Sequence, residues 1–163
     1  MRFFIRHAAD HVGQAVTVQG WMFNKRGSGK IWFLQLRDGS GVMQAIVVPE
    51  SGEETMKKAE SLTIESSVMV TGLISKHPKQ ENVFEMQVQS IDVVQIAQEY
   101  PIGKKDHGPE FLLDNRHLWL RSRRQLAVLK IRDEIIRATV EWFHQNGFLK
   151  IDTPILSNNA CEG

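Results

Sequence analysis

The chain has 163 residues, of which 42% are hydrophobic and 24% charged. This composition is typical of soluble globular proteins and excludes disordered and collagen-like classes. Lys and Arg total 20 and Asp and Glu total 19, so the net charge gives no global argument for nucleic-acid binding, and any such argument must be local.

The cysteine content and the length of the first apolar run indicate which cellular compartment and which kinds of site to expect. Cys161 is the single cysteine, and no His/Cys cluster has the spacing of zinc ligands, so neither a disulfide nor a zinc site is expected. The first apolar run ends at Ile5, which is too short for a signal-peptide core or a membrane span. We therefore expect a cytoplasmic protein with no metal site and no membrane partner.

The sequence from residue 16 to residue 48 predicts three strands joined by tight turns. Residues 16–26, 31–37 and 42–48 are rich in β-branched, aliphatic and aromatic residues, a composition typical of strands. Gly27-Ser28-Gly29 and Asp38-Gly39-Ser40-Gly41 separate them with residues typical of hairpin turns. This pattern predicts a three-stranded meander.

A helix and two further strands are expected next. Glu53 and Glu54 follow Pro49 and suit the first turn of a helix that runs to Leu62, because acidic side chains interact favourably with the helix dipole there. Residues 67–75 and 83–96 read as strands around a polar connection. Three strands, a helix and two strands is the element order of the five-stranded OB-fold barrel, which binds oligonucleotides.

The pattern changes at residues 100–109, where prolines, glycines and charges predict a linker. Apolar residues then recur at helical spacing from Arg123 to Asn146, with Gly147 as a C-terminal cap, and residues 148–152 read as one strand. A helix and one strand cannot bury each other's apolar faces. We therefore predict a mainly β protein: a barrel domain at 1–98, a hinge at 99–122, and the start of a truncated α+β domain at 123–163.

Two local motifs bear on binding. The basic stretch from Lys25 to Lys30 lacks the full phosphate-loop pattern, so a hairpin turn is the simpler interpretation, with contact to a nucleic-acid backbone as the alternative. Trp32, Phe33 and Leu34 are consecutive, so at least one large apolar side chain must point away from the barrel core. Such a side chain either packs against a loop or provides a platform on which a nucleic-acid base stacks.

The run from Gly20 to Gly39 resembles the barrel domain of the class II synthetases for aspartate, asparagine and lysine. In that family the arginine, phenylalanine and glutamine that match Arg26, Phe33 and Gln44 bind the tRNA anticodon, and the phenylalanine stacks on its middle uridine. The resemblance implies the same roles here.

Two further stretches, residues 100–112 and 115–125, resemble bacterial asparaginyl-tRNA synthetases of the bacillus type. Aspartyl enzymes usually have Leu-Asp-Leu-Arg where this chain has Leu118-Trp119-Leu120-Arg121. The asparaginyl assignment is therefore favoured, with an aspartyl-tRNA synthetase as the alternative.

The end of the long helix resembles the first signature motif of class II synthetases, which forms the dimer interface in that family. Gly147, Phe148 and Pro154 carry this likeness. Glu162 matches the glutamate of a short Glu-Gly element that holds the amino group of the amino-acid substrate, and a carboxylate suits an ammonium group because the two form a charge-assisted hydrogen bond.

The resemblance implies a homodimeric parent enzyme that uses ATP and Mg²⁺ to attach asparagine to its tRNA. The arginine motifs that stabilise phosphate charge in this class are not found in these 163 residues, so no catalytic residue is assigned, and this polypeptide is expected neither to bind ATP productively nor to aminoacylate. Two other classes stay open: a stand-alone barrel that binds single-stranded nucleic acid without enzymatic activity, and a protein-interaction barrel.

Overall fold

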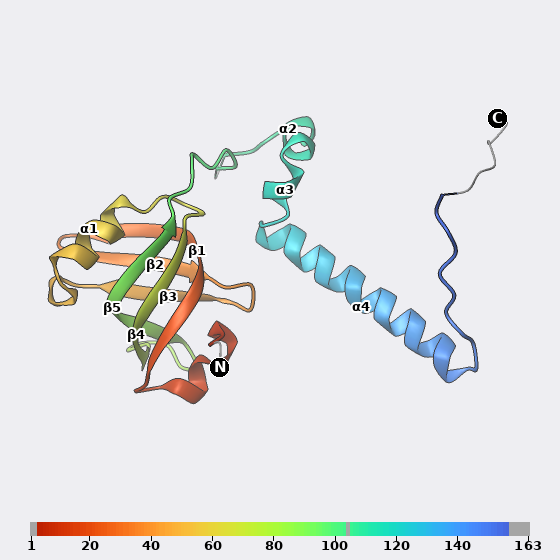
Figure 1. The fold of residues 1–163 in the computed structure, drawn as a ribbon, viewed down its shortest axis with the longest axis horizontal. Helices are drawn as coiled ribbons and strands as arrows, with labels where there is room; N and C mark the ends of the chain where they lie inside the picture. Colours follow the sequence, from red (N-terminus) through yellow and green to blue (C-terminus); the bar gives the residue numbers. More distant parts are fainter. Residues whose placement is uncertain (1–2, 104, 157–163) are drawn as a thin grey trace. The chain divides into compact units, whose positions relative to one another are not determined.

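The computed structural model describes residues 3–103 and 105–156, and the chain divides into two compact units, Met1–Pro101 and Ile102–Gly163. The first unit is a closed five-stranded β-barrel (Figure 1). Its strands are β1 (Ala15–Ser28), β2 (Ile31–Arg37), β3 (Val42–Val47), β4 (Ser67–Lys76) and β5 (Phe84–Gln95). The predicted strands and their order are confirmed.

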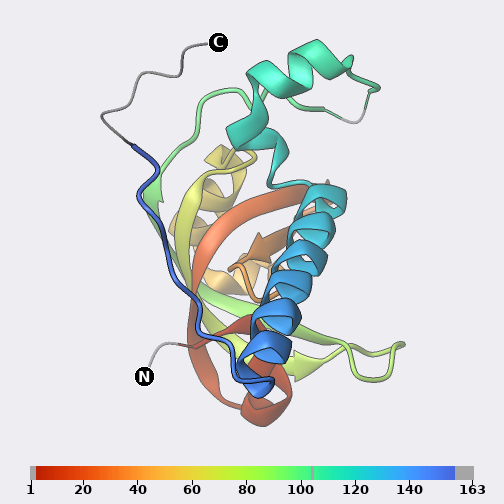
Figure 2. The same ribbon diagram turned by 90° about the vertical axis from the view of Figure 1, so that its right-hand side faces the viewer.

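The barrel closes in the order β1-β2-β3-β5-β4, in which only β3 and β5 pair in parallel. The long strand β1 makes closure possible because its first half pairs with β4 and its second half with β2, and it curves strongly along its length (Figure 2). Two glycines allow neighbouring backbones to approach closely. A Cβ at Gly20 would lie 2.3 Å from the Arg37 carbonyl oxygen, and one at Gly72 would lie 2.2 Å from that of Gln87.

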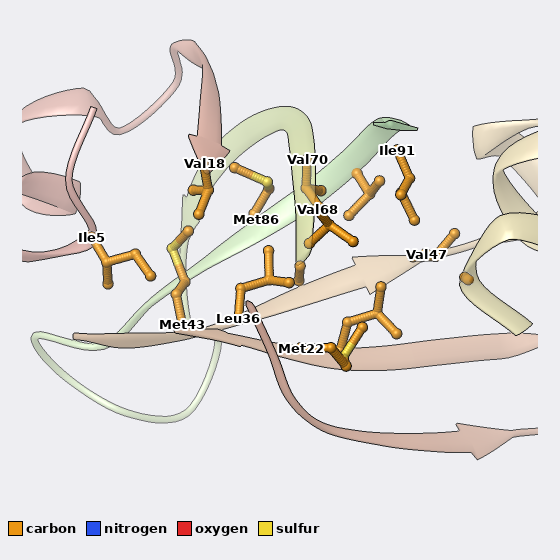
Figure 3. Packing of buried hydrophobic residues seen from close by; sticks show 14 of the residues in the cluster. Ile5, Val18, Met22, Leu36, Met43, Val47, Val68, Val70, Met86 and Ile91 are labelled. Atoms are coloured by element: carbon orange, nitrogen blue, oxygen red, sulfur yellow. The ribbon is translucent and has the colours of Figure 1, made fainter. Parts of the chain in front are cut away.

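The barrel core consists of side chains that alternate inward along each strand (Figure 3). Leu34 and Leu36 of β2 are fully buried, as are Met22 of β1 and Met86 of β5. Every buried hydrophobic residue among the described ones lies between Ile5 and Ile91, within the first unit. The barrel therefore buries its apolar side chains without help from the rest of the chain.

Three helical segments accompany the barrel. A 3₁₀ turn, η2 (Pro49–Ser51), leads into α1 (Glu53–Ser61), the predicted inter-strand helix, which buries Thr55 and Ala59. A second 3₁₀ segment, η1 (Ile5–His11), precedes β1 and was not predicted from sequence. It is attached through the backbone N–H of Ile5, which donates to Asp38 Oδ2 at 2.7 Å.

The second unit is helical. Two short helices, α2 (Pro109–Asp114) and α3 (Arg116–Trp119), occupy much of the predicted hinge, and α4 (Arg123–Gln145) follows as expected. The Ser122 side chain caps α4 by accepting from the Gln125 N–H. Within the described part of the chain, no helix combines the length and apolar character that a membrane crossing requires.

The C-terminal end of α4 is closed by a Schellman motif. Gly147 has φ +83°, its N–H donates to the His144 carbonyl, and the Phe148 N–H donates to the Phe143 carbonyl. The Phe143 and Phe148 rings pack edge to face with centroids 5.3 Å apart. The predicted Gly147 cap is confirmed. The strand predicted at residues 148–152 was wrong: these residues have no regular structure, because no strand among the described residues of this unit is available to pair with them.

Candidate nucleic-acid interface

Strand register arranges eight outward-facing residues of the barrel in two adjacent rows across β1, β2, β3 and β5. The first, which we call the aromatic row, consists of Arg26, Phe33, Ile46 and Gln87. The second, which we call the amide row, consists of Asn24, Gln35, Gln44 and Glu85. Apart from Ile46, Phe33 and the one carboxylate, these side chains are amides or a guanidinium, which suits a surface that forms hydrogen bonds with polar rings.

Phe33 is the aromatic residue that β2 presents on its outer face. It alternates with Leu34, which is fully buried, whereas Trp32 lies on the inner side and packs against the core. Phe33 itself is half-buried. The expectation that one of these three consecutive apolar residues points away from the core is confirmed.

Arg26 covers the ring of Phe33. The two residues are directly opposite each other in the β1–β2 ladder, and the Arg26 Cζ lies 4.4 Å from the ring centroid. A guanidinium at this distance makes a cation–π contact, and its planar group stacks on aromatic rings. Because Arg26 is exposed, its N–H donors remain accessible for a base edge or a phosphate.

Gln44 lies in the neighbouring row. It pairs with Gln35 in the β2–β3 ladder, and Phe33 pairs with Ile46, two residues further along β3. Gln44 is therefore a diagonal neighbour of Phe33 on the same face, within reach of a long side chain or of one planar ligand. The structure thus brings together all three residues, Arg26, Phe33 and Gln44, that the sequence selected.

Lys25 does not join this surface. Its Nζ donates to the Glu60 carbonyl at 2.6 Å, near the C-terminal end of α1, and lies 5.0 Å from the Trp32 ring centroid. Burial lowers the pKa of Lys25, and the charge of Glu60 opposes this shift in part. The ammonium group therefore satisfies carbonyls at the end of a helix, where positive charge is favoured.

Sequence reasoning did not identify five of the eight outward residues. They are Asn24, Gln35, Ile46, Glu85 and Gln87. Alternation along β2 and β3 indicates which side chains share the face of Phe33. The contribution of β5 depends on the parallel β3–β5 pairing, which no local pattern indicates.

The other predicted site residues belong to the second unit. Gly147 and Phe148 form the end of α4, and Pro154 lies in a segment without regular structure. Glu162 lies outside the described residues. No three His, Cys, Asp or Glu side chains within residues 3–103 and 105–156 come together as a metal-ligand set.

Family models match both units. The model described as "OB-fold nucleic acid binding domain" matches residues 16–94, and the model described as "tRNA synthetases class II (D, K and N)" matches residues 108–163. The first match covers all five barrel strands, and the second covers α2, α3 and α4.

Solved structures of tRNA synthetases are similar to the chain over most of its length. An asparaginyl-tRNA synthetase from Pyrococcus horikoshii complexed with asparaginyl-adenylate aligns over 100% of this chain with 34% identity and a TM-score of 0.89. The chain spans 38% of the length of that relative.

Two amoebal proteins are also similar. An asparaginyl-tRNA synthetase from Entamoeba histolytica aligns over 94% of this chain and 38% of its own, with 31% identity and a TM-score of 0.76. An aspartyl tRNA synthetase from the same organism shares the fold, with 24% identity and a TM-score of 0.80 over 98% of this chain and 40% of its own. The chain therefore belongs to the class II tRNA synthetases of the D, K and N group, and its barrel is an OB-fold nucleic acid binding domain.

Proposed function

We propose that the barrel binds the anticodon loop of a tRNA for asparagine through Arg26, Phe33 and Gln44. One observation carries this proposal: an arginine, an aromatic ring and an amide lie on one outer face, in two adjacent rows. A base that leaves the loop stack needs an aromatic platform and hydrogen-bonding groups at its edge.

Each of the three residues has a distinct part in this proposal. Phe33 stacks on the middle base, a uridine. Arg26, whose guanidinium already lies against the ring, moves aside or sandwiches the base and donates hydrogen bonds to it or to a phosphate. Gln44, diagonal to Phe33, meets the edge of the base.

The test titrates the 163-residue chain with anticodon stem-loops that differ only at the middle base. We expect the loop with uridine to bind most tightly. Phe33→Ala should weaken that binding by about 5- to 150-fold, which corresponds to the ~1–3 kcal/mol of one stacked base. Trp142→Ala is the matched control, because it removes an aromatic side chain that is 57% exposed on α4 and should leave binding unchanged.

Salt dependence separates the alternatives. Binding through phosphates should weaken as salt rises, with a slope in log K against log salt of about −0.7 for each single-strand phosphate contacted. Equal affinity for all middle bases would indicate a barrel that binds single strands without sequence choice. Indifference to both salt and Phe33→Ala would indicate a protein-interaction barrel.

For the parent enzyme we infer a cytoplasmic asparagine–tRNA ligase that uses ATP and Mg²⁺. The relative from Pyrococcus horikoshii in complex with asparaginyl-adenylate supports this inference. Activation of this kind needs positive charge to stabilise the phosphates, and the arginine motifs that supply it in this class are not found in the present sequence. We therefore expect no pyrophosphate exchange by the 163-residue chain, and measurable exchange by this chain would contradict that expectation.

We also propose that Gly147, Phe148 and Pro154 belong to the dimer interface of the parent enzyme, and that Glu162 binds the amino group of its amino-acid substrate. The apolar face of α4 supports the first of these roles, because Ile131 and Ile135 are 62% and 60% exposed. In a full-length homologue, Ile135→Glu should shift sedimentation from dimer to monomer. Glu→Gln at the position of Glu162 should raise KM for the amino acid more than KM for ATP.

A further inference from the structure

The amide row contains one buried carboxylate that the anticodon proposal does not use. Glu85 lies next to Gln44 in the parallel β3–β5 ladder and is only 6% exposed, although it alternates with the inward-facing Met86 and so belongs to the outer face. Carboxylates are seldom buried in this way unless they are hydrogen-bonded or paired. The partners of Glu85 therefore indicate what it does.

Both carboxylate oxygens of Glu85 accept from glutamine amides of the outer face. Gln44 Nε2 donates to Glu85 Oε2 at 3.4 Å, and Gln87 Nε2 donates to Glu85 Oε1 at 3.4 Å. Gln87 Nε2 also lies 3.3 Å from Ser75 Oγ on β4. A short network thus runs from the proposed base-binding amide through a buried carboxylate to the neighbouring strands.

The chemistry of this network selects one orientation of the Gln44 amide. An ionised carboxylate only accepts hydrogen bonds, so it must meet the NH₂ end of Gln44. The reversed orientation would place the amide oxygen against the carboxylate and would lose a charge-assisted hydrogen bond. With one N–H of Nε2 held by Glu85, the orientation of the amide is set, and the carbonyl oxygen Oε1 and the second N–H remain for a ligand in fixed positions.

We propose that Glu85 is a positioning residue that sets base specificity by fixing the orientation of the Gln44 amide, with Oε1 toward N3 of the base. An oxygen in that place matches uracil, whose N3 carries a hydrogen, and opposes cytosine, whose N3 is itself an acceptor. Glu85 thereby makes the site prefer uracil to cytosine without touching the base. This inference rests on the proposed anticodon function of the barrel.

The test measures the ratio of affinities for two stem-loops that carry uridine or cytidine at the middle position. Glu85→Gln keeps the shape of the side chain but can donate as well as accept, so the Gln44 amide becomes free to adopt either orientation. We expect the uridine-to-cytidine ratio to fall roughly tenfold, which is the equivalent of one hydrogen bond to a charged group.

Two further variants keep the result interpretable. Glu85→Met removes both charge and acceptor with a side chain of similar volume, a kind of replacement that buried charged sites often tolerate, and it should lower the ratio in the same way if Glu85→Gln does not fold. In a Gln44→Met background the ratio should already be low, and Glu85→Gln should not lower it further, because Glu85 acts through Gln44.

The possible outcomes separate this inference from the function on which it rests. A ratio that both Glu85 variants leave unchanged would overturn the positioning role, even if both bind more weakly, because a purely structural role would weaken the two loops equally. Failure of the unsubstituted chain to bind either loop would instead overturn the anticodon proposal. Phe33→Ala should weaken both loops and preserve the ratio.

Discussion

The two units of the chain treat their apolar side chains in opposite ways. In the barrel, Leu34 and Met86 are fully buried, whereas on α4 the side chains of Ile131 and Ile135 are 62% and 60% exposed. The barrel buries its apolar side chains in its own core, and its outer face carries the aromatic and amide rows. The apolar face of α4 still lacks cover from the described residues.

The ion pairs of the two units also differ in burial. Arg37 and Glu65 form a bidentate pair whose side chains are 14% and 6% exposed, with N–O distances of 2.9 and 2.8 Å. On α4, Arg137 binds Glu134 and Glu141 in full solvent. The hydrogen bond from Arg137 lowers the pKa of Glu134, but exposed pairs of this kind contribute little to stability. Stability is thus concentrated in the barrel, and substitutions in the two units should differ accordingly.

The largest difference in the free energy of unfolding should come from replacing one large apolar side chain by alanine in each unit. Leu34→Ala leaves a cavity in a fully packed core and should lower the free energy of unfolding of the barrel by about 4 kcal/mol. Ile135→Ala, on the exposed face of α4, should change it by less than about 0.5 kcal/mol. Amide hydrogen exchange of β2 and β4 measures this free energy directly. Equal effects would show that the barrel depends on α4.

Breaking an ion pair should have the next largest effect. Arg37→Met removes the guanidinium that donates to both oxygens of the buried Glu65 carboxylate and should cost the barrel about 3 kcal/mol. A denaturant titration of the barrel measures this loss, and Arg137→Met, the control on α4, should cause no measurable loss in it. A neutral result for Arg37→Met would mean that Glu65 is compensated by other groups.

A side chain added where two strands lie close together should destabilise the barrel by a smaller amount, again with no effect from the matched change in the second unit. In Gly72→Ala the new Cβ meets the Gln87 carbonyl oxygen and Met86 Cγ at 2.2 and 2.8 Å, so β4 and β5 must shift, at a cost of about 2 kcal/mol. Gly108→Ala introduces the same methyl group into open space in the second unit and should leave the thermal midpoint of the barrel unchanged. If Gly72→Ala also left the thermal midpoint unchanged, β4 and β5 could move apart at this position without loss of stability.

The comparison also explains which features the sequence could predict. Each barrel strand and α4 has a local sequence pattern that predicts it, and Arg26, Phe33 and Gln44 follow from the family resemblance. The residues 148–152 have a strand-like composition, but strand formation requires a partner, and composition cannot supply one. Segment η1 has only two buried residues, Ile5 and Ala8, and it is also anchored to the distant Asp38, which accepts from the Ile5 N–H.

Glu85 shows a different limit of sequence reasoning. Its proximity to Gln44 comes from a parallel pairing between strands that are far apart in the chain. In sequence it is one of two charged residues in a strand of mixed character, a position that would ordinarily be assigned to the surface. Only the register of the closed barrel shows that its carboxylate meets two amides.

The smallest effect should appear where α4 ends, and it should be confined to the second unit. Gly147 has φ +83°, a region in which a side chain costs about 1 kcal/mol or more. Gly147→Ala should therefore open the Schellman motif and speed amide exchange at Gly147 and Phe148, whose N–H groups bond to the last turn. Gly147→Asn should do so less, because asparagine tolerates the left-handed region. Exchange in the barrel strands should stay the same in both variants, since the barrel core is complete without α4; faster exchange there would show that the end of α4 stabilises the barrel after all.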